Sequence, residues 1–325
     1  MKHALIKVLI PIYNTADYLL RCVNSVRNQI YKELQIIMFD DGSSDMSPDI
    51  CDKIAMEDDR VISVHQKNAG LAMVRNRSIM LAGIQNSGGY IGFVDSDDAI
   101  DEEMYSVMME QIETDGTDVA RCGYVLVDEH DCPLGDEAYV HYPDTIMSVR
   151  EFYENQKYSH QNYLCNFLFS EKLLLDISFP QNRSYEDVAV FYRILDRVDR
   201  ISLLSSSFYR YTQRTGSILH TDSLEKSFRN FCDITLAYRE KAIYYEAKKD
   251  WKLMQIAIWD EARNVSQALS SNLYKSKLRK KVLQRKWNLV WYTIIHLNIH
   301  ATKYTVANIG CLLFCAKLHN RIKYF

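Results

Sequence analysis

Three carboxylates at the end of an apolar run are the residues in this sequence best placed to do chemistry. The run "YIGFV", residues 90–94, is followed by Asp95, Asp97 and Asp98. Alternate side chains on an extended backbone point to the same side, so Asp95 and Asp97 can approach one cation. Carboxylate oxygens favour a hard ion such as Mg²⁺ or Mn²⁺, which leaves places in its shell for substrate phosphates. The pattern therefore predicts a metal that holds a diphosphate.

A solvated turn that caps the next helix is the competing interpretation, and it would suit Asp101 well. Two further segments favour a site. "DDGSSD" begins at Asp40 after another apolar run, where Asp41 can accept hydrogen bonds from a base or ribose and Gly42 allows close backbone approach. Arg75 lies near the start of a predicted helix, where its guanidinium and the free N–H groups can meet phosphate oxygens. Taken alone, it would be an ordinary surface arginine.

The elements that must position these side chains alternate between strand and helix. Apolar runs at 6–13, 34–39, 61–65 and 90–94 predict strands, and the helical spacing between them predicts helices, one of them over 71–84. This order predicts a mostly parallel sheet covered by helices on both faces. Ligands bind such sheets beyond the carboxyl ends of the strands, so the loops after these four runs should meet at one site.

Two helices of this half have specific sequence signals. Ser47 with Pro48 predicts a capped helix start. One face of the preceding helix is predicted by the spacing of Leu19, Cys22, Val23, Val26 and Ile30.

The second half of the chain is less regular. A strand is predicted over 118–129, and a capping box at Ser148 and Glu151 predicts a helix start. An aromatic strand then ends in "YRYTQRTGSI". Beyond Thr221 the pattern is helical almost throughout, which places a soft boundary there.

Together these motifs resemble the inverting glycosyltransferases of family 2, which have the GT-A fold. The similarity covers about the first 220 residues and extends to bacterial members that assemble capsules, exopolysaccharides and lipopolysaccharides. It implies an α/β, Rossmann-like GT-A domain over 1–220, with a mostly parallel sheet flanked by helices, and a helical C-terminal region over 221–325. The matching text is "VLIPIYN", "SVRNQ", "FDDGSSD", "NAGLAMVRN", "FVDSDD" and "YEDV".

The resemblance also implies roles for individual residues. The nucleoside would be held by Pro11, Tyr13 and Asp41, with Asp40 nearby, and Arg75 would meet the diphosphate. Asp97 would be the main ligand of the metal, Mn²⁺ or Mg²⁺, and Asp95 would lie near the ribose or the metal. Asp98 would face the transferred sugar or the acceptor. Arg214 and Ser217 lie in a segment common among polysaccharide-assembling members and can close over the diphosphate. An aromatic strand with a polar turn explains that segment equally well.

Inverting transfer needs a base that takes the proton of the acceptor hydroxyl, and a cation that stabilises the leaving diphosphate. In the family a Glu-Asp pair supplies the base. Here the pair is Glu186-Asp187, and the resemblance assigns the base to Asp187. The alternative is that both residues cap the following helix, whose positive end suits carboxylates. Catalysis is favoured because the pair lies where the other motifs require it.

The C-terminal tail differs in charge from the rest of the chain. The net charge of the 325 residues is -3, yet from Lys275 onward there are eleven basic residues and no acidic one. Such a basic, aromatic, amphipathic helix suits an anionic membrane surface, and its apolar runs are shorter than the roughly 18 residues that span a bilayer. Packing of the apolar face on the catalytic domain is the alternative, and nucleic acid is not an expected partner. His296 and His300 are expected to be interfacial rather than metal ligands.

The sequence thus predicts a metal-dependent enzyme that moves a sugar from a nucleotide donor, expected to be a UDP-sugar, to a glycan or lipid-linked acceptor. A sugar nucleotidyltransferase would need a glycine-rich basic loop after the first strand, and "PIYNTAD" is not one. A non-catalytic module that binds nucleotide sugars would have lost the base or the metal ligands, which are present. Eight cysteines without a CxxC pair are typical of reduced core thiols, so we expect a cytoplasmic protein, peripheral on the inner membrane face if the tail binds lipid.

Overall fold

A computed structural model describes residues 4–83, 88–155, 163–214, 223–271 and 276–297. The chain forms two compact units, which are divided mainly near residue 215. Of the described residues, the second unit takes 153–155, 183–189, 223–271 and 276–297, and the first unit takes the rest.

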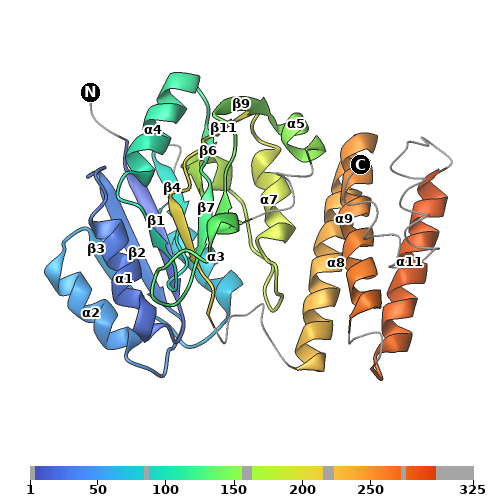
Figure 1. Cartoon of the computed structure of the whole chain (residues 1–325), viewed down its shortest axis with the longest axis horizontal. Helices are drawn as coiled ribbons and strands as arrows, with labels where there is room; N and C mark the ends of the chain where they lie inside the picture. Colours follow the sequence, from blue (N-terminus) through green and yellow to red (C-terminus); the bar gives the residue numbers. More distant parts are fainter. Residues whose placement is uncertain (1–3, 84–87, 156–162, 215–222, 272–275, 298–325) are drawn as a thin grey trace. The chain divides into compact units, whose positions relative to one another are not determined.

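The first unit contains a large, mostly parallel sheet (Figure 1). The four predicted strands are present and parallel to one another: β1 (Ile6–Ile12), β2 (Leu34–Asp40), β3 (Val61–His65) and β4 (Tyr90–Phe93). They lie at one side of the sheet in the order β3-β2-β1-β4. The sheet continues through β10 (Phe167–Ser170), β6 (Val119–Arg121), β11 (Arg200–Leu203) and β9 (Thr145–Ser148). In this part β10 runs antiparallel to both neighbours, and β9 runs antiparallel to β11.

Helices pack against this sheet: α1 (Ala16–Arg27), α2 (Ser47–Glu57), α3 (Leu71–Leu81), α4 (Met104–Asp115), α5 (Val149–Glu154) and α7 (Val188–Leu195). The predicted face of α1 is buried in the main core from Leu19 to Val26. Ile30 is not part of it, because α1 ends at Arg27, and Ile30 is 51% exposed with its N–H bonded to the Glu102 carbonyl.

The start of α2 differs in detail from the prediction. Ser47 is the first helical residue rather than the cap, and its hydroxyl accepts a hydrogen bond from the Thr15 N–H, 3.2 Å away. The Asp45 carboxylate accepts from the Ser47 N–H at 3.0 Å, and thus satisfies one of the free donors at the helix start. Pro48 lies in the first turn as expected. At α5 the predicted capping box is confirmed, with the Glu151 N–H donating to the Ser148 hydroxyl and the Ser148 N–H donating to the Glu151 carboxylate.

The strand predicted over 118–129 is divided between two sheets. Its first part is β6, and its second part, β7 (Tyr124–Val127), belongs to a smaller sheet of order β5-β12-β7-β8 with β5 (Ala99–Ile100), β8 (Tyr139–Val140) and β12 (Tyr209–Thr212). Gly123 lies between the two parts, and a Cβ there would meet the Val140 carbonyl oxygen at 2.3 Å. Only glycine therefore allows the chain to cross between the sheets at this point.

The second unit is helical, as the sequence predicted beyond Thr221. It contains α8 (Leu224–Ala247), α9 (Trp251–Ser270) and α11 (Arg279–Leu297), with α9 packed against both of the others (Figure 1). Ser223 caps α8 and Asp250 caps α9 through their side-chain oxygens. The segment 183–189 belongs to this unit because Arg183 forms two hydrogen bonds with Glu240 of α8. That the catalytic domain ends at residue 220 stays a prediction.

Six cysteines lie in the described part of the chain, and all are free thiols. Cys22, Cys51 and Cys122 are buried, whereas Cys132 is exposed. No helix within the described ranges is long and apolar enough to cross a membrane.

Gly42, in the loop after β2, is expected to be needed for stability. Its φ is +72°, and a Cβ there would meet the Asn68 amide nitrogen at 2.8 Å and the Gln66 carbonyl oxygen at 2.9 Å. Gly42→Ala should lower the free energy of unfolding, measured in urea, by about 1–3 kcal/mol from φ alone, and further because backbone must move. Gly116→Ala is the matched control, since Gly116 has φ +61° but no neighbour within 4 Å of the added Cβ. Equal losses for the two variants would show that the close approach is unimportant.

Candidate active site

The loops that follow the four parallel strands are bonded to one another, as predicted for the carboxyl edge of this sheet. Each bond joins strand ends or loops that are far apart in sequence. They are Asp41 N–H to the Ile12 carbonyl (2.8 Å), Asn14 N–H to the Ser43 hydroxyl (2.9 Å), Gln66 N–H to the Asp40 carbonyl (3.0 Å) and Thr15 hydroxyl to the Ser96 hydroxyl (2.9 Å).

Asp41 joins the loop after β2 to the loop that leads into α3. The carboxylate is 3% exposed. One oxygen accepts from the Gln66 side chain and the Ala69 N–H, and the other accepts from the Gly70 N–H, with both N–H distances 2.8 Å. These protein donors give Asp41 a positioning role, and its direct contact with the nucleoside stays a prediction.

Asp40 is also buried and bonded to the protein. Its oxygens lie 3.1 Å from the Ser43 amide nitrogen and 3.1 Å from Nδ1 of His65. Nε2 of the same imidazole lies 2.8 Å from Asp52. The hydrogen bond to Asp52, followed by that to Asp40, raises the pKa of His65, so the positive charge on this ring persists to higher pH than in a free histidine.

The two residues predicted at the end of β1 differ in exposure. Pro11 is a buried residue of the strand, whereas the Tyr13 side chain beyond it is 52% exposed. An exposed aromatic ring at the edge of the sheet provides a surface on which a base can stack.

Arg75 is buried, in contrast to the surface arginine that was the alternative. Its Nη2 lies 3.3 Å from the Asp95 carboxylate, which is one-third exposed. The guanidinium carbon lies 6.0 Å and 5.8 Å from the ring centroids of Phe93 and Phe179. Two aromatic rings and a carboxylate thus hold this buried cation at the end of β4.

Asp97 is paired with Arg214, the last residue before the undescribed segment 215–222. Nε of Arg214 donates to Oδ2 of Asp97 at 2.6 Å, and both side chains are partly exposed. Ser217 lies outside the described residues.

Arg21 of α1 also contacts this loop, and no sequence motif singled it out. Its Nη2 donates to the Asp97 carbonyl at 2.8 Å and to the Thr212 hydroxyl at 2.7 Å. An isolated arginine on a helix is a common surface residue, so only the tertiary contacts identify it.

Asp98 is fully buried, with 0% exposure. Tyr209 of β12 donates its phenol proton to one carboxylate oxygen at 2.6 Å, and the Thr212 N–H donates to the other at 2.8 Å. Burial, with smaller contributions from Asp97 and Asp95, raises its pKa well above the usual value. The structure therefore adds a positioning role for Asp98, while contact with the sugar or acceptor stays a prediction.

The chemistry of this loop fits a hard divalent cation. Asp95 and Asp97 present partly exposed carboxylates on one short loop, and carboxylate oxygen is the preferred ligand of Mg²⁺ and Mn²⁺. Within the described residues, no group of three or more His, Cys, Asp or Glu side chains is placed to hold a metal ion. Phosphate oxygens of a donor would therefore have to complete the coordination shell.

The Glu186-Asp187 pair belongs to the second unit. Glu186 is buried and Asp187 is half-buried, with Oδ1 of Asp187 accepting from the Val188 N–H at 2.8 Å. Tyr185, directly before the pair, has φ +58°. A bulky residue in this region is strained and is found where the surrounding structure holds it in place, often at functional sites.

The α8 helix supplies that support. Besides the Arg183–Glu240 pair, the Ser184 N–H donates to Asp233 at 2.9 Å, and Tyr185 packs on the small cluster that contains Ile234. One oxygen of Asp187 therefore serves the start of α7, as the capping interpretation expected, and its role as a base stays a prediction.

A parallel sheet whose strand-end loops carry paired carboxylates and arginines is suited to bind a phosphorylated ligand together with a cation. The model of the family described as glycosyl transferase family 2 matches residues 7–170. "Glycosyltransferase GlyG" from Streptococcus pneumoniae serotype 4 is 33% identical over 228 residues, which cover 67% of this chain and 74% of GlyG. The chain belongs to glycosyl transferase family 2, and it is a transferase enzyme.

Solved structures show the same fold. TarS 1-349 from S. aureus, in complex with UDP-GlcNAc, has a TM-score of 0.67 and 19% identity, over 99% of this chain and 93% of TarS 1-349. The mannosyltransferase PcManGT from Pyrobaculum calidifontis, in complex with GDP-Man and Mn²⁺, has a TM-score of 0.53 and 14% identity, over 100% of this chain and 89% of PcManGT.

Proposed function

We propose that this enzyme transfers a sugar from a UDP-sugar to a hydroxyl group of a glycan or lipid-linked oligosaccharide, with inversion and with Mn²⁺ or Mg²⁺. The observation that carries the proposal is the loop after β4, where Asp95 and Asp97 meet Arg75 and Arg214. Two carboxylates for a cation and two guanidinium groups for phosphate oxygens are what a nucleoside diphosphate needs. UDP-GlcNAc in TarS supports a UDP-sugar donor, and Mn²⁺ in PcManGT supports the choice of metal.

The residues of the chain then have distinct roles in donor binding. The Tyr13 ring and the loops joined by Asp40 and Asp41 hold the nucleoside, and Arg75 faces the diphosphate. Asp97, with Asp95, would hold the metal, which supplies positive charge to the leaving diphosphate. Because Arg214 now neutralises Asp97, the cation would free this guanidinium to bind phosphate.

The transfer step requires a proton acceptor on the acceptor side. Asp187 takes the proton of the acceptor hydroxyl as its oxygen bonds to the anomeric carbon and the bond from that carbon to the diphosphate oxygen breaks. The diphosphate leaves with the electron pair. Glu186, buried beside Asp187, supports the position of the base.

A panel of nucleotide sugars tests this function without an acceptor. UDP-glucose, UDP-galactose, UDP-GlcNAc, UDP-GalNAc and GDP-mannose are each added with Mn²⁺ or Mg²⁺, and both thermal stabilisation and slow hydrolysis are measured. We expect at least one UDP-sugar to raise the melting temperature and to be hydrolysed. A folded enzyme that binds none of the UDP-sugars would overturn the proposal.

Metal dependence should act through Asp97. Asp97→Ala should weaken the binding of UDP in Mn²⁺ by about tenfold or more, because a ligand of the cation is lost. Asp101→Ala, in the same acidic segment but paired with Arg210, is the matched control and should bind UDP like the parent. Calorimetry gives both dissociation constants. Full transfer in excess chelator would contradict the prediction.

Asp187→Asn separates catalysis from donor binding. This variant keeps the size of the side chain but accepts no proton, so transfer should fall by roughly a hundred- to ten-thousandfold. The dissociation constant of donor and metal should stay close to that of the parent, because their assigned contacts lie elsewhere. Glu186→Gln should have a smaller effect. Near-normal transfer by Asp187→Asn, with loss in Glu186→Gln, would identify Glu186 as the base instead.

The C-terminal helices favour a contact with anionic lipid on the inner face of the cell membrane. Val282 and Leu289 of α11 are buried within the helical unit, so the part of its apolar face that the structure describes packs on protein. The solvent-facing side of α11 carries basic side chains. Among them, Lys286 has its ammonium group 5.5 Å from the ring centroid of Trp287, which is 49% exposed. The proposed attachment is therefore mainly electrostatic.

Charge reversal tests this attachment better than truncation, because α11 packs on α9. Arg279→Glu with Lys280→Glu should lower cosedimentation with phosphatidylglycerol vesicles by about tenfold or more, and added salt should lower that of the parent. Lys32→Glu with Lys53→Glu makes the same charge change on exposed lysines of the first unit. Equal pelleting of both double variants would exclude α11 as the attachment site.

A further inference from the structure

The imidazole of His65, at the end of β3, lies between two carboxylates that come from different elements. Its Nδ1 lies 3.1 Å from Oδ2 of Asp40, the last residue of β2, and its Nε2 lies 2.8 Å from Oδ1 of Asp52 in α2. The hydroxyl of Ser63, two residues earlier on β3, lies 3.1 Å from the same Asp52 oxygen. We call Asp40, His65 and Asp52 the carboxylate–histidine clamp. No sequence motif identified it, because its members come from three elements.

The geometry of the clamp requires a proton on each ring nitrogen. Both nitrogens face a carboxylate oxygen, which can only accept, and neutral imidazole can donate from one nitrogen alone. The hydrogen bond to Asp52 and, more weakly, that to Asp40 outweigh the effect of burial and raise the pKa of His65 above the ordinary 6.5. Cys51 of α2 also interacts with both aspartates, but burial raises its pKa to about 12, so this thiol stays neutral. The ring is therefore mostly imidazolium at pH 6.5.

Asp40 depends on this cation more than Asp52 does. The Asp52 side chain is 57% exposed, so water can solvate its charge, whereas the Asp40 side chain is 3% exposed. Among the residues that the structure describes, His65 is the only basic residue that forms an ion pair with Asp40. A buried carboxylate that loses its counter-charge is strongly unfavourable. Deprotonation of His65 therefore leaves a buried, uncompensated negative charge at the carboxyl edge of the sheet.

Asp40 transmits this constraint to the loops that the proposed function assigns to the nucleoside. Its second carboxylate oxygen accepts from the Ser43 N–H at 3.1 Å. The Ser43 hydroxyl in turn accepts from the Asn14 N–H at 2.9 Å, and Asn14 directly follows Tyr13. Asp41, next in the chain, holds the loop that leads into α3. A change in the position of Asp40 is thus passed to the loops after β1 and β2 and to Asp41.

We propose that His65 is a positioning residue for the nucleoside diphosphate, because as an imidazolium it holds Asp40, and through it the loops after β1 and β2, in the arrangement that binds the donor. The inference rests on the proposed function, since it concerns the donor site of the same enzyme. When the ring loses its proton, one hydrogen bond of the clamp is lost and the site gains negative charge, which disfavours an anionic ligand.

The sign of the resulting pH dependence follows from the raised pKa of His65. Because folding raises this pKa above 6.5, the effect of the charged ring is fully present below pH 6.5 and is lost as the pH rises through the pKa in the folded protein. Donor affinity should therefore be highest on the acid side of this pKa and should fall on its alkaline side.

His65→Gln tests the role of the charge, because glutamine donates a hydrogen bond but has no proton that titrates. The dissociation constant of UDP in Mg²⁺ is measured by calorimetry, for the parent and the variant, at about pH 6 and about pH 9. The ratio of variant to parent removes the titration of UDP itself. We expect a ratio of about ten at the lower pH and close to one at the higher pH, where the ring of the parent is neutral too.

His141→Gln is the matched control. His141 directly follows β8 in the smaller sheet and is exposed, and its Nδ1 lies 2.9 Å from the Ser205 carbonyl oxygen rather than from a carboxylate. Its ratio should stay close to one at both pH values. Melting temperatures confirm that each variant is folded.

Asp52→Asn is the second variant, and it keeps the histidine. The exposed Asp52 carboxylate contributes most to raising the pKa of His65, so its loss should lower that pKa and shift the fall in UDP affinity to lower pH by the same amount. Asp49→Asn makes the same charge change in the first turn of the same helix and should leave both nearly unchanged. A pH titration of the histidine resonances by NMR reports the pKa, and the resonance of His65 is the one missing from His65→Gln. A purely structural contribution of Asp52 would not move the pH dependence of UDP affinity.

The inference is supported if the ratio for His65→Gln falls with pH, the ratio for His141→Gln does not, and Asp52→Asn moves the fall in UDP affinity together with the pKa of His65. It is overturned if the parent binds UDP and the ratio for His65→Gln is the same at both pH values, or if the pKa and the affinity do not move together in Asp52→Asn. A parent enzyme that binds neither UDP nor any UDP-sugar overturns the proposed function itself, and with it the inference, so the two failures are distinguishable.

Discussion

Repulsion among three carboxylates on the loop after β4 is the constraint on which the structure of the site depends. Asp95, Asp97 and Asp98 lie within four consecutive residues, and like charges this close in sequence repel one another. Each of the three carboxylates has a different environment. Arg75 pairs with Asp95, Arg214 pairs with Asp97, and Asp98 is buried against Tyr209 and Thr212, where burial and its neighbours raise its pKa. Two carboxylates thus stay available at the end of the sheet, and the third ties their loop to β12.

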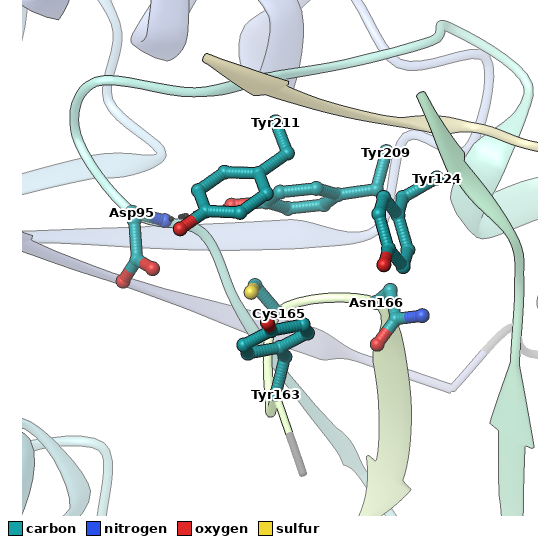
Figure 2. Close-up of a pocket in the computed structure, with 7 residues that line it drawn as sticks. All are labelled: Asp95, Tyr124, Tyr163, Cys165, Asn166, Tyr209 and Tyr211. Atoms are coloured by element: carbon teal, nitrogen blue, oxygen red, sulfur yellow. Dashed lines mark hydrogen bonds between the residues drawn. The ribbon is translucent and has the colours of Figure 1, made fainter. Parts of the chain in front are cut away.

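The strand β12 consequently serves several functions at once. Tyr209 holds both Asp98 and the Asp95 N–H, Thr212 contacts Arg21, and the chain then continues to Arg214. Tyr211, between Tyr209 and Thr212, lines a small pocket beside Asp95 (Figure 2). The same four-residue strand thus supports the acidic loop and contributes to that pocket.

The Glu186-Asp187 pair is supported in a different way. Arg183 and Ser184 bond to α8, and the left-handed backbone of Tyr185 is held by packing on the cluster that contains Ile234. A proposed base whose backbone is fixed on a long helix is well suited to catalysis, since a general base must keep its position while its charge changes. The helical unit therefore does more than pack α11 against α9. It holds the segment in which the resemblance places the base.

The sequence by itself determined the elements that depend on local pattern: the strands β1 to β4, the helices between them and the order of the strand-end motifs. Alternation and helical spacing are properties of neighbouring residues, so they can be read without a structure. The capping box at Ser148 is equally local. Only the tertiary structure decided that Asp98 is buried, that the strand over 118–129 is divided at Gly123, and that Arg21 contacts the loop after β4. Each of these depends on residues far apart in sequence, as Tyr209 and Asp98 are, 111 positions from each other. Burial and hydrogen bonding of this kind follow from the way the sheets pack, which no local pattern in the sequence specifies.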